Sequence, residues 1–116
     1  MPLKIVQTDH AGSPVLAVDG DLDLVTAPLL ADAAIALADS GQHDIVIDAT
    51  ALQFCDSSGL TAFVRIANHL APDGRLAVVA PQPIVLRVLD VSGLTEAFVV
   101  TDTVADALRV LATATR

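Results

Sequence analysis

The feature that most constrains the fold is an alternation of short apolar strands with amphipathic helices over most of the chain. Strands that alternate with helices in this way pair in parallel through right-handed crossovers. The segments that carry the pattern are a strand over 43–49, a helix over 58–71, a strand over 75–80, a short helix over 83–91, a strand over 97–100 and a helix over 104–112. The alternation predicts an α/β fold with a largely parallel sheet.

The first forty residues add a different connection at one side of this sheet. Two short alternating runs, 3–8 and 14–18, flank the polar segment "DHAGS", which predicts an antiparallel hairpin. The segment "TAPLLADAAIALADSG" then predicts a helix: Thr26 can cap it, Pro28 lies in its first turn and Gly41 ends it. We therefore expect a mixed, mostly parallel central sheet with an antiparallel N-terminal hairpin and about four helices.

Length and charge limit the kind of protein this is. At 116 residues the chain predicts a single domain over 1–116. Its composition is 53% hydrophobic with only 3% aromatic residues, so the core must be aliphatic. A formal net charge of −8 repels phosphate backbones, which argues against a nucleic-acid partner.

The cellular compartment expected for the protein follows from its use of cysteine and from the absence of long apolar runs. Cys55 is the only cysteine of the chain, so neither an intrachain disulfide nor a thiolate metal site can form. Charged or polar residues interrupt every segment before it reaches a membrane-spanning length, and the first residues do not resemble a signal peptide. We expect a cytoplasmic protein that does not insert into a membrane.

The most informative stretch is "FCDSSGL" (54–60), between an apolar strand and an apolar helix. Asp56, Ser57 and Ser58 are residue types that cap helices, because their oxygens accept hydrogen bonds from the free N–H groups of the first turn. One cap would suffice, however, and Gly59 in the first turn costs up to about 1 kcal/mol relative to alanine. The glycine suggests that something approaches the backbone closely at this point.

Three functions fit serines at the start of a helix: a nucleophile, a phosphate-binding loop or a phosphorylation site. A nucleophile needs a nearby base, but His10, His43 and His69 all lie far from Ser57 in the predicted topology, and the G-x-S-x-G elbow is absent. The phosphate-loop motif G-x-x-x-x-G-K-[ST] is absent too. No pattern of histidines or aspartates predicts a metal, and no cofactor is expected.

A family resemblance favours the third function. "FCDSSGL" resembles the signature of the STAS domain, and in particular of free-standing bacterial anti-sigma factor antagonists. "GDLDLVTA" (20–27), "IVIDATALQF" (45–54), "GRLAVV" (74–79) and "VLRVLDVSGL" (85–94) resemble further family segments in the same order and spacing. Asp21 replaces the usual glutamate, and Cys55 replaces a usual isoleucine or methionine.

The resemblance implies a protein that switches partners. In the family the serine after the aspartate is phosphorylated, which corresponds to Ser57 here; Asp56 would help to position its hydroxyl, and Ser58 and Gly59 would shape the turn. The implied partners are an anti-sigma factor that is also a serine kinase and a phosphatase. The alternatives are a STAS subunit that is never phosphorylated, such as the small partner of a lipid-transport ATPase, and, more remotely, a serine hydrolase.

The partner would dock around Ser57. Besides the four residues just named, the candidates for this docking surface, all expected to be exposed beside Ser57, are Asp21, Leu22, Asp23, Thr61, Arg65, Ser92 and Gly93. Each of these seven has an ordinary alternative role as a turn residue or as part of a solvated helix face, and that alternative stays open.

Overall fold

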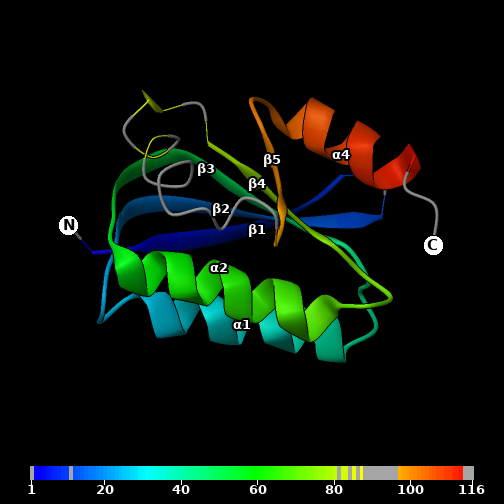
Figure 1. Cartoon of the computed structure of the whole chain (residues 1–116), viewed down its shortest axis with the longest axis horizontal. Helices are drawn as coiled ribbons and strands as arrows, with labels where there is room; N and C mark the ends of the chain where they lie inside the picture. Colours follow the sequence, from blue (N-terminus) through cyan, green and yellow to red (C-terminus); the bar gives the residue numbers. More distant parts are fainter. Residues whose placement is uncertain are drawn as a thin grey trace.

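A computed structural model describes residues 2–10, 12–80, 82, 83, 85, 87 and 97–113 (Figure 1). Its strands and helices, in chain order, are β1 (Lys4–His10), β2 (Ser13–Leu22), α1 (Ala27–Asp39), β3 (Ile45–Cys55), α2 (Ser57–Leu70), β4 (Leu76–Val79), β5 (Val99–Thr101) and α4 (Val104–Thr113). The predicted helix over 83–91 falls mostly outside the described residues. Every other predicted element is present.

The strands form one mixed sheet in the order β1-β2-β3-β4-β5, which is also their order along the chain. β1 and β2 make the predicted antiparallel hairpin, whereas β2, β3, β4 and β5 pair in parallel. α1 connects β2 to β3, and α2 connects β3 to β4. The prediction of an α/β fold with a mostly parallel sheet is confirmed.

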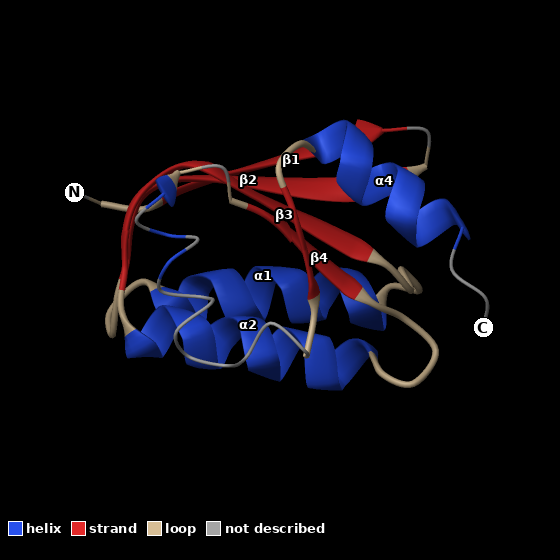
Figure 2. Cartoon of the chain, turned by 45° about the horizontal axis from the view of Figure 1, so that its top comes forward, coloured by secondary structure: helices blue, strands red, loops and turns tan. Residues whose placement is uncertain are grey.

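Helices cover the two faces of the sheet unequally. α1 and α2 lie side by side against one face, and α4 lies against the other (Figures 1 and 2). The main apolar core fills the space between the sheet and the α1–α2 pair, and a smaller core lies beneath α4. Among the described residues, no helix is both long and apolar enough to span a membrane.

The core is aliphatic, as the composition requires. Leu16, Leu22, Leu30 and Ile47 are at most 2% exposed, and burial of each such side chain contributes about 1.5–3 kcal/mol. On α2 the apolar side chains that recur at helical spacing face the sheet; Val64 is half-buried, and the others are buried: Leu60, Phe63, Ala67 and Leu70. Three further residues of α2 are also buried: Gly59, Ala62 and Ile66.

The ends of α1 follow from its sequence. Pro28 lies in the first turn, where its missing N–H has no partner to lose. At the other end Gly41 has a φ of 109°, a left-handed conformation that glycine adopts without strain. The N–H of Gln42 then donates a hydrogen bond to the carbonyl of Leu37 at 3.2 Å, which closes the helix. The predicted stop at Gly41 is confirmed.

Candidate functional site

The serines lie where two strands of the sheet end side by side. β2 and β3 are parallel neighbours, so their carboxyl ends meet at one edge of the sheet. Leu22 is opposite Cys55 in this register, and the N–H of Asp56 donates a hydrogen bond to the carbonyl of Leu22 at 3.2 Å. The fold therefore brings the segment 20–23 against the start of α2, although the two are far apart in the sequence.

Asp56 caps α2. Its carboxylate accepts hydrogen bonds from the N–H groups of Ser58 at 2.8 Å and Gly59 at 3.3 Å. The backbone of Asp56 is extended, as is usual for the residue that precedes a helix. The expected capping role of this segment is confirmed, and the carboxylate of Asp56 performs it.

Ser57 is the first residue of α2 and its side chain is exposed. Within the described part of the chain its hydroxyl has no hydrogen-bond partner, whereas its carbonyl accepts a hydrogen bond from the Thr61 hydroxyl at 2.9 Å. Ser58 is half-buried. The hydroxyl of Ser57 is thus accessible to another protein, at the positive end of the helix dipole.

Gly59 is buried, and what approaches it comes from the protein's own core. A Cβ at this position would lie 2.7 Å from the Cys55 sulfur and 2.8 Å from a methyl carbon of Leu22. The expected exposure of Leu22 is wrong: its side chain is 0% exposed and packs under the start of α2. Gly59 and Leu22 therefore hold α2 against the end of β2 from within.

The loop between β2 and α1 is closed by Asp23 and Thr26. The Asp23 carboxylate accepts hydrogen bonds from the N–H groups of Val25 and Thr26, both at 3.0 Å, and the hydrogen bond from Thr26 is the largest cause that lowers the pKa of Asp23. The expectation that Thr26 caps α1 is wrong, because its side chain makes no capping hydrogen bond to the helix. Its hydroxyl instead accepts from the N–H of Asp23 at 2.9 Å and lies 2.8 Å from the Asp21 carbonyl, to which it donates.

Exposed apolar side chains lie on this closed loop and near the end of β3, and none of them was among the residues predicted for the site. Leu24 is 76% exposed and Val25 is 78% exposed, and Phe54, just before Cys55, is 49% exposed. Neighbouring large apolar side chains exposed on a loop, as Leu24 and Val25 are, are typical of protein-binding surfaces. The sequence contained a signal for this exposure. Leu24 and Val25 stand between polar turn residues, and neither fits the apolar spacing of the strand before them or of the helix after them.

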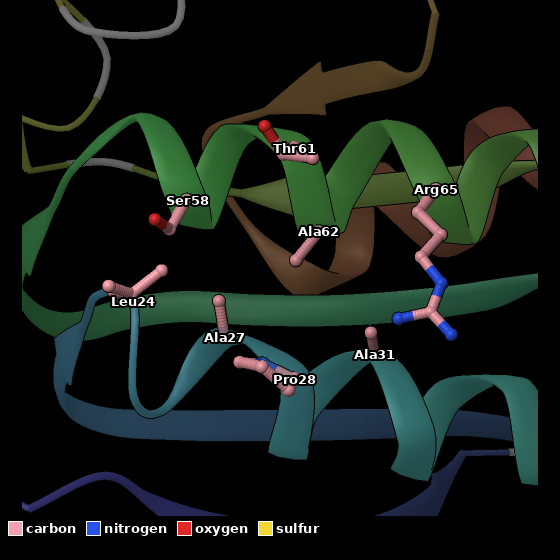
Figure 3. A pocket seen from close by; sticks show the side chains of 8 residues that line it. All are labelled: Leu24, Ala27, Pro28, Ala31, Ser58, Thr61, Ala62 and Arg65. Carbon is pink, nitrogen blue, oxygen red and sulfur yellow. The ribbon is translucent and has the colours of Figure 1, made fainter.

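The remaining expected site residues lie along α2 or outside the described residues. Thr61 and Arg65 are exposed on α2, and Asp21 and Asp23 are half-buried at the end of β2. Figure 3 shows Ser58, Thr61 and Arg65 on α2: Ser58 lies opposite the loop residue Leu24, and the Arg65 side chain extends toward the first turns of α1. The other two expected residues, Ser92 and Gly93, lie outside the described residues.

None of the three histidines can act as a base for Ser57. His10 is paired with Ser13 at the start of β2, and His43 precedes β3, so both lie at the edge of the sheet opposite Ser57. His69 is near the far end of α2, where it contacts Asp39 on α1 at 2.9 Å. Within the described ranges no group of three or more His, Cys, Asp or Glu side chains could hold a metal ion.

Comparison with known proteins identifies the family. The STAS domain family matches residues 3–107, nearly the whole chain. The chain belongs to the STAS-domain family. The resemblance carried by "FCDSSGL" and "GDLDLVTA" is thereby confirmed.

Relatives of this STAS domain are anti-sigma factor antagonists. RsfB of Mycobacterium tuberculosis (strain CDC 1551 / Oshkosh), an anti-sigma-F factor antagonist, is 29% identical over 106 residues, covering 91% of this chain and 87% of RsfB. An anti-sigma factor antagonist from Mycobacterium paratuberculosis has a crystal structure that matches with a TM-score of 0.89 and 32% identity, covering 96% of this chain and 95% of that one. The Bacillus protein SpoIIAA in its phosphorylated form shares the fold, with a TM-score of 0.67 and 22% identity, covering 93% of this chain and 97% of that one.

The thiol beneath the site of this STAS domain gives a prediction for alkaline pH. Burial, and secondarily the negative charge of Asp56, raises the pKa of Cys55 from its ordinary 9.0 to about 11. Between these two pH values the folded protein keeps the thiol proton while the unfolded chain loses it, so the free energy of unfolding should fall as pH rises, by at most about 1.4 kcal/mol per pH unit. The chain contains no tyrosine, and Lys4 is its only lysine, so few other groups titrate in this range.

Urea unfolding at pH 8 and at pH 10.5 measures the effect, and Cys55→Ala is the control. The decline should be clearly smaller in the Cys55→Ala variant, which has no thiol to ionise. An equal decline in both proteins would show that Cys55 does not titrate in this way.

Proposed function

We propose that this protein is an anti-sigma factor antagonist that is switched by phosphorylation at Ser57. Unphosphorylated, it binds an anti-sigma factor in the cytoplasm and so releases a sigma factor; phosphorylated, it lets the anti-sigma factor go. The observation that carries the proposal is the exposed hydroxyl of Ser57 at the start of α2, which has no hydrogen-bond partner among the described residues. This hydroxyl lies where β2 and β3 end, beside the loop on which the apolar side chains of Leu24 and Val25 are exposed to solvent.

The position of Ser57 suits a switch that acts locally. A phosphate adds about −1.5 to −2 charge, and the N–H groups and dipole at a helix N-terminus tolerate it. Arg65, on the same helix, is about two turns further along, on the order of 12 Å, so it cannot fold over a phosphate on Ser57 without a long reach. The charge would therefore stay at the surface that the partner covers, and the fold would be retained.

The docking surface we propose is centred on Asp56, Ser57 and Ser58. It extends to Asp21 and Asp23 on one side and to Thr61 and Arg65 on the other, with Leu24 and Val25 as apolar contacts. Leu22 and Gly59 support the surface from beneath, since both are buried. Because only a few residues of an interface carry most of its binding energy, we expect the two apolar loop residues, Leu24 and Val25, to dominate, and Ser57 to act through the charge it gains on phosphorylation.

The relatives support this assignment. RsfB and the M. paratuberculosis protein are anti-sigma factor antagonists. SpoIIAA, which shares the fold, has been observed in both an unphosphorylated and a phosphorylated form. We infer the same class of partner for this chain, an anti-sigma factor with serine kinase activity, and a phosphatase that restores the hydroxyl.

The decisive experiment is phosphorylation in vitro. The protein is mixed with ATP and each candidate anti-sigma kinase from its own genome, and any phosphate is located by mass spectrometry. Phosphate is expected on Ser57, lost in Ser57→Ala and retained in Ser58→Ala, the matched neighbour. If no kinase modifies the protein and it co-purifies instead with a membrane ATPase, the phosphorylation switch is wrong and an unphosphorylated STAS subunit is the better assignment.

A further inference from the structure

A groove runs between α1 and α2, beginning beside the proposed switch. Its volume is about 230 Å³, which is below the roughly 300–1,000 Å³ typical of small-molecule sites and suits a side chain better than a cofactor. Most of its walls are apolar and come from the loop before α1, from α1 and from α2; its lining residues are Leu24, Ala27, Pro28, Ala31, Ser58, Thr61, Ala62 and Arg65.

Arg65 gives the groove a charged end. Its side chain is exposed and, within the described residues, has neither an ion pair nor a hydrogen bond. In Figure 3 it extends from α2 across the groove toward α1, with its guanidinium near Ala31. An arginine with no acidic partner among the described residues is notable in a chain of 14 acidic and 6 basic residues. A guanidinium in this position can bind a carboxylate with two parallel hydrogen bonds.

The opposite end of the groove is continuous with the Ser57 surface. Ser58 and Leu24 line that end, and Figure 3 shows the two side chains facing each other there. Arg65 is seven positions after Ser58 on α2, about 10 Å along the helix axis at 1.5 Å per residue. A protein that covers Ser57 can therefore place a side chain in the groove and a charge on Arg65 at the same time.

We propose that this groove anchors an apolar side chain of the anti-sigma factor, and that a carboxylate beside that side chain pairs with Arg65. The inference rests on the proposed function for the identity of the partner. The apolar walls favour an apolar side chain, and the guanidinium, which has no ion pair within the described part of the chain, favours an acidic neighbour. The groove thereby adds a second contact to the Ser57 switch, one that phosphorylation does not alter directly.

The first test measures binding of the anti-sigma kinase that modifies Ser57, by calorimetry. Arg65→Glu should weaken binding by about 10- to 100-fold, because it replaces an attraction with a repulsion at a partly desolvated contact. Arg109→Glu is the matched control: Arg109 lies on α4, on the other face of the sheet, and contacts Asp106. It should change binding less than threefold.

The second test examines the groove without any partner. 4-Phenylbutanoate and 4-phenylbutanol differ only in their carboxylate and alcohol groups, and each is titrated into the ¹⁵N-labelled protein. Amide shifts should cluster at Ala31, Ser58, Ala62 and Arg65. The carboxylate should bind at least threefold more tightly than the alcohol, and Arg65→Gln should abolish that difference.

The outcomes separate this inference from the proposed function. If the kinase binds and modifies Ser57 but Arg65→Glu behaves like Arg109→Glu, the groove inference is wrong while the proposed function stands. The inference is also overturned if the two probes bind equally well or shift residues outside the groove. If no anti-sigma factor binds the wild-type protein, the proposed function fails, and the assignment of the groove's occupant to an anti-sigma factor fails with it.

Discussion

The Ser57→Asp variant is expected to bind the anti-sigma factor about 30- to several thousand-fold more weakly than the wild type while remaining folded. An uncompensated charge buried in the docked interface costs about 2 to 5 kcal/mol, which corresponds to that loss. The Ser57 hydroxyl has no partner within the described residues, so no contact that holds the fold is lost. Calorimetric titration measures the affinity, and circular dichroism checks the fold.

Two further variants isolate the charge in this experiment. Ser57→Ala should bind at wild-type strength and should do so constitutively, because it cannot be phosphorylated. Ser57→Asn has nearly the size of the aspartate without its charge and should bind much more tightly than Ser57→Asp. If the asparagine and aspartate variants bind equally weakly, size and not charge is responsible. An unfolded Ser57→Asp variant would refute the local-charge mechanism.

Elements near the site could be predicted because their signals are local. The period of α2 placed Phe63 and Leu70 on its buried face, and Gly41 marked the end of α1. Capping by the segment 56–58 was also predictable, since carboxylates and hydroxyls are the usual caps. The parallel order of the strands then placed the ends of β2 and β3 together at one edge.

The parts that were missed depend on tertiary packing or on a turn. Leu22 was expected to be exposed between two aspartates, although it continues the alternation of Leu16 and Val18, which are both buried. Thr26 was assigned to capping, because the sequence does not show that its hydroxyl turns back toward β2. The close approach to Gly59 was predicted without its sources, which are the Cys55 sulfur just before the helix and the Leu22 side chain from a strand more than thirty residues earlier in the chain.

The Gly59→Ala variant should lower the free energy of unfolding by about 1 to 2 kcal/mol. Alanine would normally stabilise a helix by up to about 1 kcal/mol over glycine, but overpacking a core costs about 1–3 kcal/mol. Here the new methyl would lie 2.7 Å from the Cys55 sulfur and 2.8 Å from Leu22, and both of those side chains are buried. Urea unfolding measures the change, and Asn68→Ala, at an exposed position of α2, is the control for helix propensity.

A double variant locates the clash. Cys55→Ala removes the nearer of the two contacts, so Gly59→Ala should cost less in that background than in the wild type, with a coupling energy of about 0.5 kcal/mol or more. Additive effects would contradict the packing explanation.

Because Gly59 holds the start of α2 against the end of β2, the methyl of Gly59→Ala should also shift Ser57 relative to Leu24 and Val25. The Gly59→Ala variant keeps Ser57 itself unchanged. If it binds the partner more weakly, then the partner recognises the distance between Ser57 and the loop residues Leu24 and Val25 as well as the serine.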